Sequence, residues 1–123
     1  SEGNHVGKIL VILNHKPLQE QIDELRKLGY DEVEFVQHPL IPADAEMPHV
    51  ASIFSAHING REFDALWIQG DFRFFAVALE YCKVTGKPLY VATTERKAVE
   101  QVMPDGSVVK KSVFKHVKFV RVV

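Results

Sequence analysis

The sequence predicts one α/β domain spanning residues 1–123, with a three-layer parallel sheet and a C-terminal β-hairpin arm. Three observations predict this fold. Short continuous apolar runs, typical of strands buried on both faces, alternate with segments of helical periodicity. The length and a hydrophobic fraction of 46% suit a single domain with one core. Near the C-terminus, a turn signal separates two valine-rich segments, which is typical of a hairpin.

The first half of the chain is expected to fold as strand, helix, strand, loop and helix. Both helical segments repeat apolar residues at steps of three and four. Pro17 suits the first turn of the first helix, and Gly29 and Gly60 suit the residues that follow the two helices. Three prolines mark the loop. The expected elements are a strand at 8–14, a helix at 16–29, a strand at 31–38, a loop at 39–48 and a helix at 49–60.

The second half is expected to continue the alternation and then to end in β-structure. Asp71 suits the N-cap of the third helix, and Gly86 and Pro88 stop that helix. The sequence Pro-Asp-Gly at 104–106 predicts the hairpin turn, with the glycine in a left-handed conformation. The expected elements are a strand at 64–70, a helix starting at 72, a strand at 88–94, a hairpin of 97–103 against 107–114, and a last strand at 115–123.

Polar side chains follow all four strands of the predicted parallel sheet. Because right-handed crossovers place the carboxyl ends of parallel strands at one edge, these residues are expected to meet there. Gly70 lets a ligand approach the backbone closely, and helix N-termini at this edge attract anions. The plainer interpretation is that Asp71 only caps a helix and Gly70 only makes a tight turn. The strand-end residues are Asn14-His15, Gln37-His38, Gln69-Gly70-Asp71 and Thr93-Thr94.

The charges are separated along the chain. Residues 1–95 hold 8 Lys and Arg against 14 Asp and Glu, a balance of −6, whereas residues 96–123 hold 7 against 2, a balance of +5. A basic C-terminal segment on an acidic body favours an anionic partner that meets this end of the chain. The alternative is that the two signs mix once the chain folds, because block charge does not reveal spatial clustering.

The sequence lacks the motifs that are typical of several common kinds of site. Cys82 is the only cysteine, so no internal disulfide forms and a reducing compartment is expected. No histidine or cysteine spacing is typical of a metal site, and there is neither a dinucleotide-binding glycine motif nor a Walker motif. No apolar run approaches the roughly 20 residues of a membrane-spanning helix. The start, residues 1–7, has no initiator Met and no signal-peptide core, and is interpreted as a loose terminus or expression remnant. A cytoplasmic protein is expected.

Two of the six histidines stand out. His15 follows the first strand at the expected ligand edge, and His116 lies in a basic stretch near the C-terminus. Neither has an adjacent Ser or Cys nucleophile, so a catalytic triad cannot be argued. His49 and His57 fit structural roles on the second helix.

Four stretches of the sequence recur together in one protein family. They are NHKPL after the first strand, IQGDF after the third, YVATTERK after the fourth, and DGSVVKKSVFKHVKF near the end. On these stretches the chain resembles the small stand-alone CRISPR-associated proteins with a Rossmann-like CARF domain, which are regarded as ring nucleases of type III systems. The resemblance runs from about Lys8 to Arg121, and its last stretch is the most specific.

The resemblance implies a metal-independent phosphodiesterase that needs no cofactor. Such proteins bind cyclic tetra-adenylate, a second messenger of type III CRISPR antiviral defence, and cleave it to linear diadenylate, which switches off the effectors that the ring activates. They work as homodimers with the ring across the two-fold axis. The 2′-hydroxyl of the substrate attacks its own 3′-phosphate and leaves a cyclic 2′,3′-phosphate. The expected partners are therefore cyclic tetra-adenylate and a second copy, with no membrane and no DNA.

The residues that suit this chemistry lie at the expected ligand edge and on the basic arm. A histidine protonates the leaving oxygen, and a cation stabilises charge developing on the phosphate. Arg73, which stands where the family has a smaller residue, adds a phosphate contact. The expected catalytic residues are His15, His116 and Arg96, with His15 ranked first. The expected ligand-binding residues are Asn14, Gln69, Gly70, Asp71, Phe72, Arg73, Thr93, Thr94, Lys97, Lys110, Lys111 and Lys115, and no metal ligand is expected.

Two alternatives stay open. A sensor or sponge that binds the ring without cutting it needs the same contacts, so the sequence does not separate it from an enzyme. An unrelated mononucleotide-binding α/β protein would prefer AMP or a dinucleotide and would need no dimer axis.

Overall fold

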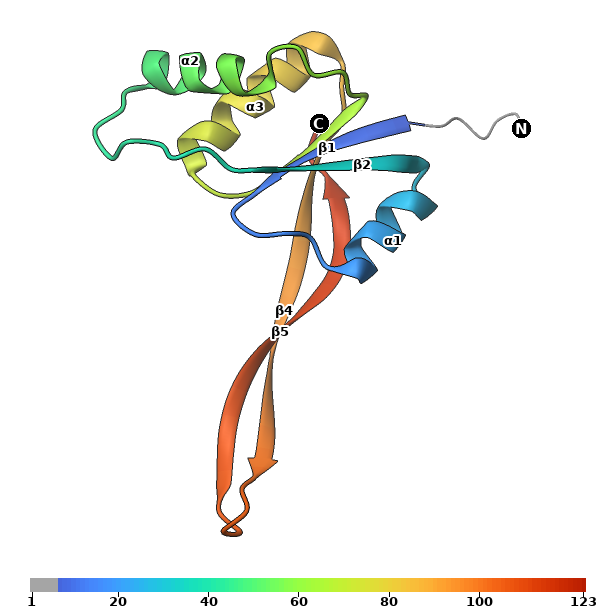
Figure 1. The fold of residues 1–123 in the computed structure, drawn as a ribbon, viewed down its shortest axis with the longest axis vertical. Coiled ribbons are helices and arrows are strands. Elements are labelled where there is room, and N and C mark those ends of the chain that lie inside the picture. The colour runs from blue at the N-terminus through green and yellow to red at the C-terminus, as the bar shows by residue number, and fades with distance from the viewer. Residues whose placement is uncertain (1–6) are drawn as a thin grey trace.

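The computed structural model describes residues 7–123 as a mixed five-stranded sheet with three helices (Figure 1). The strand order across the sheet is β2-β1-β3-β4-β5. The first four strands run parallel, and β5 runs antiparallel to β4, so the α/β class and the parallel pairing predicted for the first four strands are confirmed. The elements are β1 (Gly7–Leu13), α1 (Gln19–Lys27), β2 (Tyr30–Gln37), α2 (Met47–Ile58), β3 (Ala65–Ile68), α3 (Phe72–Thr85), β4 (Leu89–Val102) and β5 (Val108–Arg121).

The helices pack against both faces of the sheet, and β1 shows why. Its side chains alternate between the two faces, as those of any strand do. Ile9 and Val11 pack in a cluster with Leu25 of α1, whereas Leu10 and Ile12 pack in a cluster with residues of α2 and α3. All of β1 except Lys8 is buried, as its continuous apolar run predicts. Of the N-terminal segment interpreted as a loose terminus, residues 1–6 lie outside the described residues, and Gly7 begins β1.

Two strands replace four predicted ones in the C-terminal third. The strand expected at 88–94 and the first hairpin strand at 97–103 form one strand, β4. The second hairpin strand at 107–114 and the last strand at 115–123 likewise form β5. The prediction of separate strands was wrong because β4 and β5 pair along their whole length, and the polar residues 94–96 do not interrupt the ladder.

The predicted hairpin turn is confirmed. Gly106 has a φ of 84°, and the N–H of Met103 donates to the carbonyl of Ser107 over 2.8 Å. Beyond the rest of the sheet, β4 and β5 continue as a two-stranded ribbon that projects from the body of the protein (Figure 1). Residues 95–115 are called the arm below.

A β-bulge at the base of the arm is held by a carboxylate from α1. The register of β4 against β5 shifts just before Thr94, which leaves Val117 as the bulged residue. Glu24 Oε1 lies 2.6 Å from His116 Nε2, and Oε2 accepts the N–H of Phe119 over 2.9 Å. Burial alone would raise the pKa of Glu24, but these two hydrogen bonds outweigh burial and hold the pKa below its usual value. One carboxylate therefore ties α1 to the start of the arm.

Replacing Glu24 with Gln is expected to lower the free energy of unfolding by about 1–3 kcal/mol at pH 6, the range for losing a charged hydrogen-bond partner. Because the pKa of Glu24 is lower in the folded protein than in the unfolded chain, the ionised carboxylate stabilises the fold at pH values above its unfolded pKa. This stabilisation is lost as the pH falls through the folded pKa. The stability difference between wild type and Glu24→Gln should therefore shrink between pH 6 and pH 3 in urea denaturation. Glu20→Gln, at the exposed start of α1, is the control. A stability difference between wild type and Glu24→Gln that is the same at pH 6 and pH 3 would contradict this role of Glu24.

Candidate functional site

Polar side chains that follow β1 and β3 gather with Thr94, which lies within β4, in one hollow at the carboxyl edge of the sheet. Its volume is about 210 Å³, and we call it the carboxyl-edge hollow. The structure thus brings together five residues that the sequence singled out, and α1 adds Gln21, which the sequence did not suggest. Its lining residues are Leu13, Asn14, His15, Gln21, Trp67, Gln69, Gly70, Ala92 and Thr94.

Gln69 is held in one orientation by two donors. Its Oε1 accepts the indole N–H of Trp67 over 2.7 Å and the backbone N–H of Ala92 over 2.8 Å. These two bonds use the acceptor capacity of the amide, while no hydrogen bond within residues 7–123 uses Gln69 Nε2. Gln69 therefore offers amide N–H donors to the hollow, and Trp67 fixes this orientation from beneath.

Gly70 is required because a histidine ring packs directly against it. A Cβ at this position would lie 2.5 Å from His38 Cδ2 and 2.6 Å from Nε2, and the φ of Gly70 is 152°. His38 follows β2, is only 7% exposed, and packs on the ring of Phe74 with the centroids 4.6 Å apart. Its Nδ1 lies 2.7 Å from the carbonyl of Pro39, so Nδ1 carries the proton in the neutral ring. His38 thus shapes the turn that lines the hollow.

Asp71 and Arg73 form a clamp at the start of α3. Asp71 caps the helix by accepting the N–H of Arg73 over 2.8 Å, as predicted for this position. The hydrogen bonds from Arg73 hold the pKa of Asp71 at about 2. The Arg73 guanidinium also donates to Asp71 and to the carbonyls of Pro42 and Ala45 in the loop before α2. Its donors are occupied within the fold, so the geometry does not support the predicted phosphate contact of Arg73.

Phe72, between the two clamp residues, presents an apolar ring to solvent at the same edge. It is 91% exposed, although it is a large aromatic side chain in the first turn of a helix. Aromatic rings in such positions provide stacking surfaces for nucleic-acid bases. Leu40, on the loop that follows β2, is similarly exposed and lines a neighbouring hollow with Asp71.

The two histidines singled out from the sequence lie in different environments. His15 lines the carboxyl-edge hollow and is exposed, and its Nδ1 lies 3.0 Å from the carbonyl of Lys16. Because a carbonyl only accepts, Nδ1 carries the proton and Nε2 remains open to solvent or ligand. His116 is buried, does not line the hollow, and holds Glu24. Its place in the bulge gives it a structural role, and the geometry does not support the predicted catalytic role.

The predicted cationic residues lie outside the hollow on the arm. The guanidinium of Arg96 lies over the ring of Phe114, 5.0 Å from its centroid, which is a cation–π contact. Thr94, two residues before Arg96, lines the hollow, whereas the hydroxyl of Thr93 donates to the carbonyl of Lys118. The four lysines predicted as ligand contacts are all exposed on the arm, at positions 97, 110, 111 and 115.

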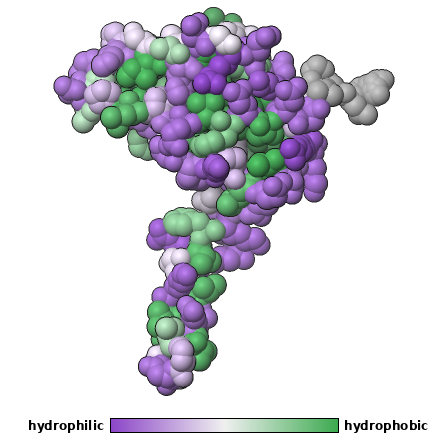
Figure 2. All heavy atoms as spheres, in the orientation of Figure 1, coloured by the Kyte–Doolittle hydropathy of each residue, from purple (hydrophilic) through white to green (hydrophobic). Residues whose placement is uncertain are grey.

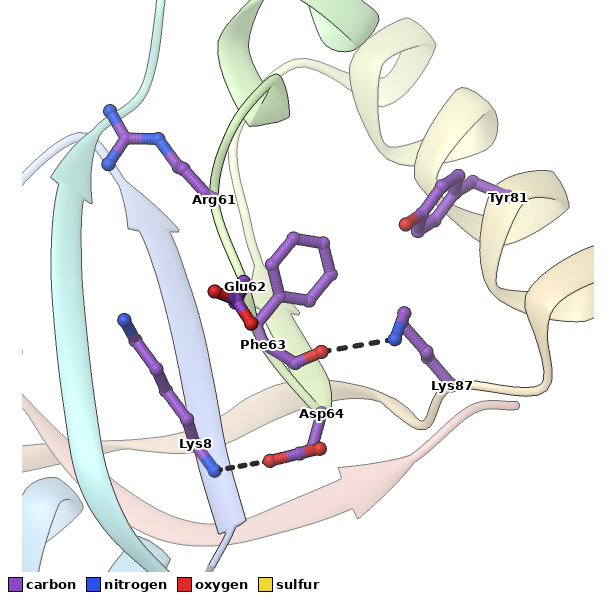
Figure 3. Close-up of a pocket in the computed structure, with 7 residues that line it drawn as sticks. All are labelled: Lys8, Arg61, Glu62, Phe63, Asp64, Tyr81 and Lys87. Carbon is purple, nitrogen blue, oxygen red and sulfur yellow. Dashed lines mark hydrogen bonds between the residues drawn. The ribbon is translucent and has the colours of Figure 1, made fainter.

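A second hollow, of about 420 Å³, lies at the opposite edge of the sheet (Figure 3). Its cations already have partners: Lys8 and Arg61 both form ion pairs with Glu34, and Lys87 donates to the carbonyl of Phe63. Asp64 accepts the backbone N–H of Lys8. These contacts link the starts of the parallel strands, so this hollow is explained by structural pairing.

Within residues 7–123, no cluster of three or more His, Cys, Asp or Glu side chains is arranged to hold a metal ion. Nor does any helix in this range have the length and apolar character needed to cross a bilayer.

The fold and the hollow define a class of protein: an α/β domain in which parallel strands bring uncharged polar side chains to one edge, beside a basic β-ribbon. The chain belongs to the uncharacterized protein MJ1673 family, whose sequence profile matches residues 7–120. The match runs from the start of β1 almost to the end of β5, so it includes both the hollow and the arm. No curated protein matches the chain.

Proposed function

We propose that this protein is a ring nuclease with a Rossmann-like CARF fold that binds cyclic tetra-adenylate and cleaves it to linear diadenylate, ending type III CRISPR signalling. The observation that carries the proposal is the carboxyl-edge hollow, where uncharged donors and acceptors meet one exposed histidine beside a basic arm. In open α/β sheets, ligands bind at this edge. The resemblance of four sequence stretches to the CRISPR-associated family supplies the identity of the ligand.

The parts of the hollow suit an adenylate ring. The Nε2 of Gln69 donates to acceptor nitrogens on adenine edges, and Asn14 and Thr94 supply both donors and acceptors. Phe72 offers its exposed ring for stacking, which contributes about 1–3 kcal/mol per base in proteins that bind single strands. Arg96 and the arm lysines neutralise phosphates.

The proposed reaction is transesterification followed by release of the product. The 2′-oxygen of one nucleotide bonds to its own 3′-phosphorus, the bond from phosphorus to the next 5′-oxygen breaks, and the 2′-hydroxyl proton passes to solvent. His15, in its protonated form, donates a proton from Nε2 to the leaving 5′-oxygen, while its Nδ1 stays oriented by the carbonyl of Lys16. Holding the 2′-oxygen in line with the leaving oxygen contributes several kcal/mol more.

Incubation with radiolabelled cyclic tetra-adenylate in EDTA tests the proposal. The expected products are linear diadenylates that end in a cyclic 2′,3′-phosphate, separated by chromatography. A ring that remains intact, with no detectable binding in calorimetry, would contradict the proposal, and tighter binding of AMP would favour the mononucleotide-binding alternative.

A non-cleaving sensor or sponge is the second candidate. It is favoured by one observation: of the two histidines proposed for catalysis, only His15 lines the hollow, because His116 is buried against Glu24. The same incubation separates the two functions, since a sponge binds the ring tightly and leaves it intact after long incubation.

The proposed site requires two copies, with the ring lying over the carboxyl edges of both sheets. A symmetric dimer presents the same edge twice, which matches a ring of four identical nucleotides. Light scattering at micromolar concentration is expected to give the mass of a dimer, about twice 13.9 kDa. A monomer mass both with and without cyclic tetra-adenylate would contradict this expectation.

Arg96→Ala is expected to weaken ring binding by about 1–3 kcal/mol in calorimetry, the range for losing a charged hydrogen-bond partner. Arg96 is the cation closest in sequence to Thr94 on the same face of the ribbon, so it is placed to reach a phosphate at the hollow. Arg26→Ala, which removes an exposed arginine from α1, is the matched control. Equal affinities for Arg96→Ala and wild type would remove Arg96 from the site.

A further inference from the structure

The arm exposes far more surface than a two-stranded ribbon normally leaves uncovered. Every residue from 94 to 112 is exposed, and the ribbon projects from the body without a helix on either face (Figure 1). Isolated two-stranded ribbons are marginally stable in water. At about 3.3 Å per residue, the eight steps from Thr94 to Val102 extend roughly 26 Å. A ribbon of this kind is stabilised when another surface packs on it.

The exposed surface of the arm is both apolar and basic. Figure 2 shows apolar residues along the arm among charged ones. Lys97, Lys111 and Lys115 fall on one face of the ribbon, because Lys111 pairs with Val99 and Lys115 pairs with Glu95. The large apolar side chains exposed along the arm are Val99, Val102, Met103, Val108, Val109 and Phe114.

This lysine face points away from the hollow of the same copy. Thr94 lines the hollow, and strand residues an odd number of positions from Thr94 project to the other face of the ribbon. Lys97 lies three residues beyond Thr94 along β4. Lys111 lies opposite Val99, which is five residues, or roughly 16 Å, beyond Thr94 along the strand. Lys97 and Lys111 thus lie away from the hollow of their own copy, and Lys115, opposite Glu95, lies on the same face at the base of the arm.

A second copy offers the complementary surface. The arm holds 5 Lys and Arg against 3 Asp and Glu, a balance of +2, whereas residues 1–94 hold 8 against 13, a balance of −5. The arm projects from this acidic part of the chain (Figure 1). Glu20 and Asp23 are both exposed on α1, the helix that supplies Gln21 to the hollow, so this helix carries acidic side chains on the body of the protein. Opposite charges of this kind steer two surfaces together.

We infer that the arm of one copy docks on the body of a second copy and places Lys97, Lys111 and Lys115 at the partner's carboxyl-edge hollow. The exchange is reciprocal, so both copies use the same surfaces and the assembly closes as a two-fold dimer. Each site is then composite: one copy supplies His15, Asn14 and Gln69, and the other supplies the lysines. The part of this inference that concerns ligand phosphates rests on the proposed function.

Complementation between two inactive variants tests the composite site. One parent is His15→Ala, and the other is the arm variant Lys97→Gln/Lys111→Gln/Lys115→Gln. Heterodimers carrying two affinity tags contain one site with both changes and one site with neither, so about half of the wild-type cleavage rate should return. If each arm serves its own hollow, both sites carry one change and the heterodimer stays as inactive as its parents, which would overturn the inference. An arm variant that cleaves at the wild-type rate would also overturn it.

The matched control is Arg26→Gln/Lys27→Gln/Lys83→Gln, which removes three exposed cations from the body and changes the net charge by the same amount. This variant is expected to cleave as wild type does. Loss of activity equal to that of the arm variant would show that total charge, and not the arm, is what matters.

Photo-crosslinking tests the docking of the arm without any ligand, and so stands even if the proposed function fails. Val99→p-benzoylphenylalanine places a photoreactive group on the lysine face, opposite Lys111. Irradiation is expected to give crosslinked dimers, with the attachment mapped by mass spectrometry to α1 or the hollow of the other copy. The same group at Val84, exposed at the end of α3, is the control and should give no such dimer. Crosslinks confined to one chain would overturn the arm exchange.

Discussion

His15→Ala is expected to lower the single-turnover rate of ring cleavage by about 100-fold or more, with ring affinity nearly unchanged. The reason is that His15 is the histidine that lines the carboxyl-edge hollow, with Nδ1 hydrogen-bonded to the carbonyl of Lys16, which leaves Nε2 as its other proton donor when the ring is protonated. Loss of a general acid slows the breaking of the bond to the leaving oxygen without removing a contact that binds the ring. Rapid-quench assays with radiolabelled ring in excess protein measure this rate directly.

His49→Ala is the matched control, because His49 is exposed on α2 and does not line the hollow. A rate that survives in His15→Ala and falls in His116→Ala would reverse the assignment. His116 is buried against Glu24, so that comparison requires the stability of His116→Ala to be measured beside its rate. Normal cleavage by both variants would leave catalysis to Arg96, the lysines and in-line positioning.

Gly70→Ala is expected to lower the free energy of unfolding and to abolish ring binding. The positive φ alone costs about 1–3 kcal/mol for a residue with a Cβ. Overpacking against the His38 ring, 2.5 Å from the new Cβ, adds a similar amount, about 1–3 kcal/mol. Urea denaturation and calorimetry measure the two effects separately.

Two further variants isolate the contact with His38. Gly60 also has a positive φ, of 77°, but a Cβ there meets nothing within 4 Å, so Gly60→Ala carries only the backbone cost. Combining Gly70→Ala with His38→Ala removes the clash and should recover part of the stability lost by Gly70→Ala. Equal losses for Gly70→Ala and Gly60→Ala would show that the close approach of His38 does not matter.

The parallel core was predictable because its signals are local. A continuous apolar run such as β1 is stable only when helices cover both faces of the strand. The N-cap Asp71 and the C-cap Gly86 set the start and the end of α3, as the sequence predicts. The arm was only partly predictable. Thr94, Glu95 and Arg96 resemble the end of a strand, yet they pair with β5 in a ribbon exposed to solvent, where polar side chains are compatible with strand structure.

In the candidate site, too, features with local sequence signals were predictable, and contacts between distant segments were not. The gathering of Asn14, Gln69 and Thr94 follows from the parallel topology, because each stands at the end of an apolar run in the sequence, although Thr94 itself lies within β4. The loop carbonyls that Arg73 contacts and the Glu24 partner of His116 are not visible there, because each depends on a contact between distant segments. Glu24 and His116 are 92 residues apart, and nothing local marks either as half of a pair. The position of His38 at the end of a predicted strand indicated that it lies at the ligand edge. Its contact with Gly70 could be seen only in the folded structure, because the two residues lie far apart in the sequence.

The location of the ligand tests the central claim most directly. Cyclic tetra-adenylate titrated into ¹⁵N-labelled protein is expected to shift the backbone amide signals of Gln69, Gly70 and Thr94 together with the side-chain amide of Asn14. The amides of Lys8, Asp64 and Lys87, at the opposite edge of the sheet, should stay unchanged and serve as the internal control. Shifts confined to that opposite edge, or no shifts with ligand in excess, would contradict the assignment of the carboxyl-edge hollow as a site for cyclic oligoadenylate.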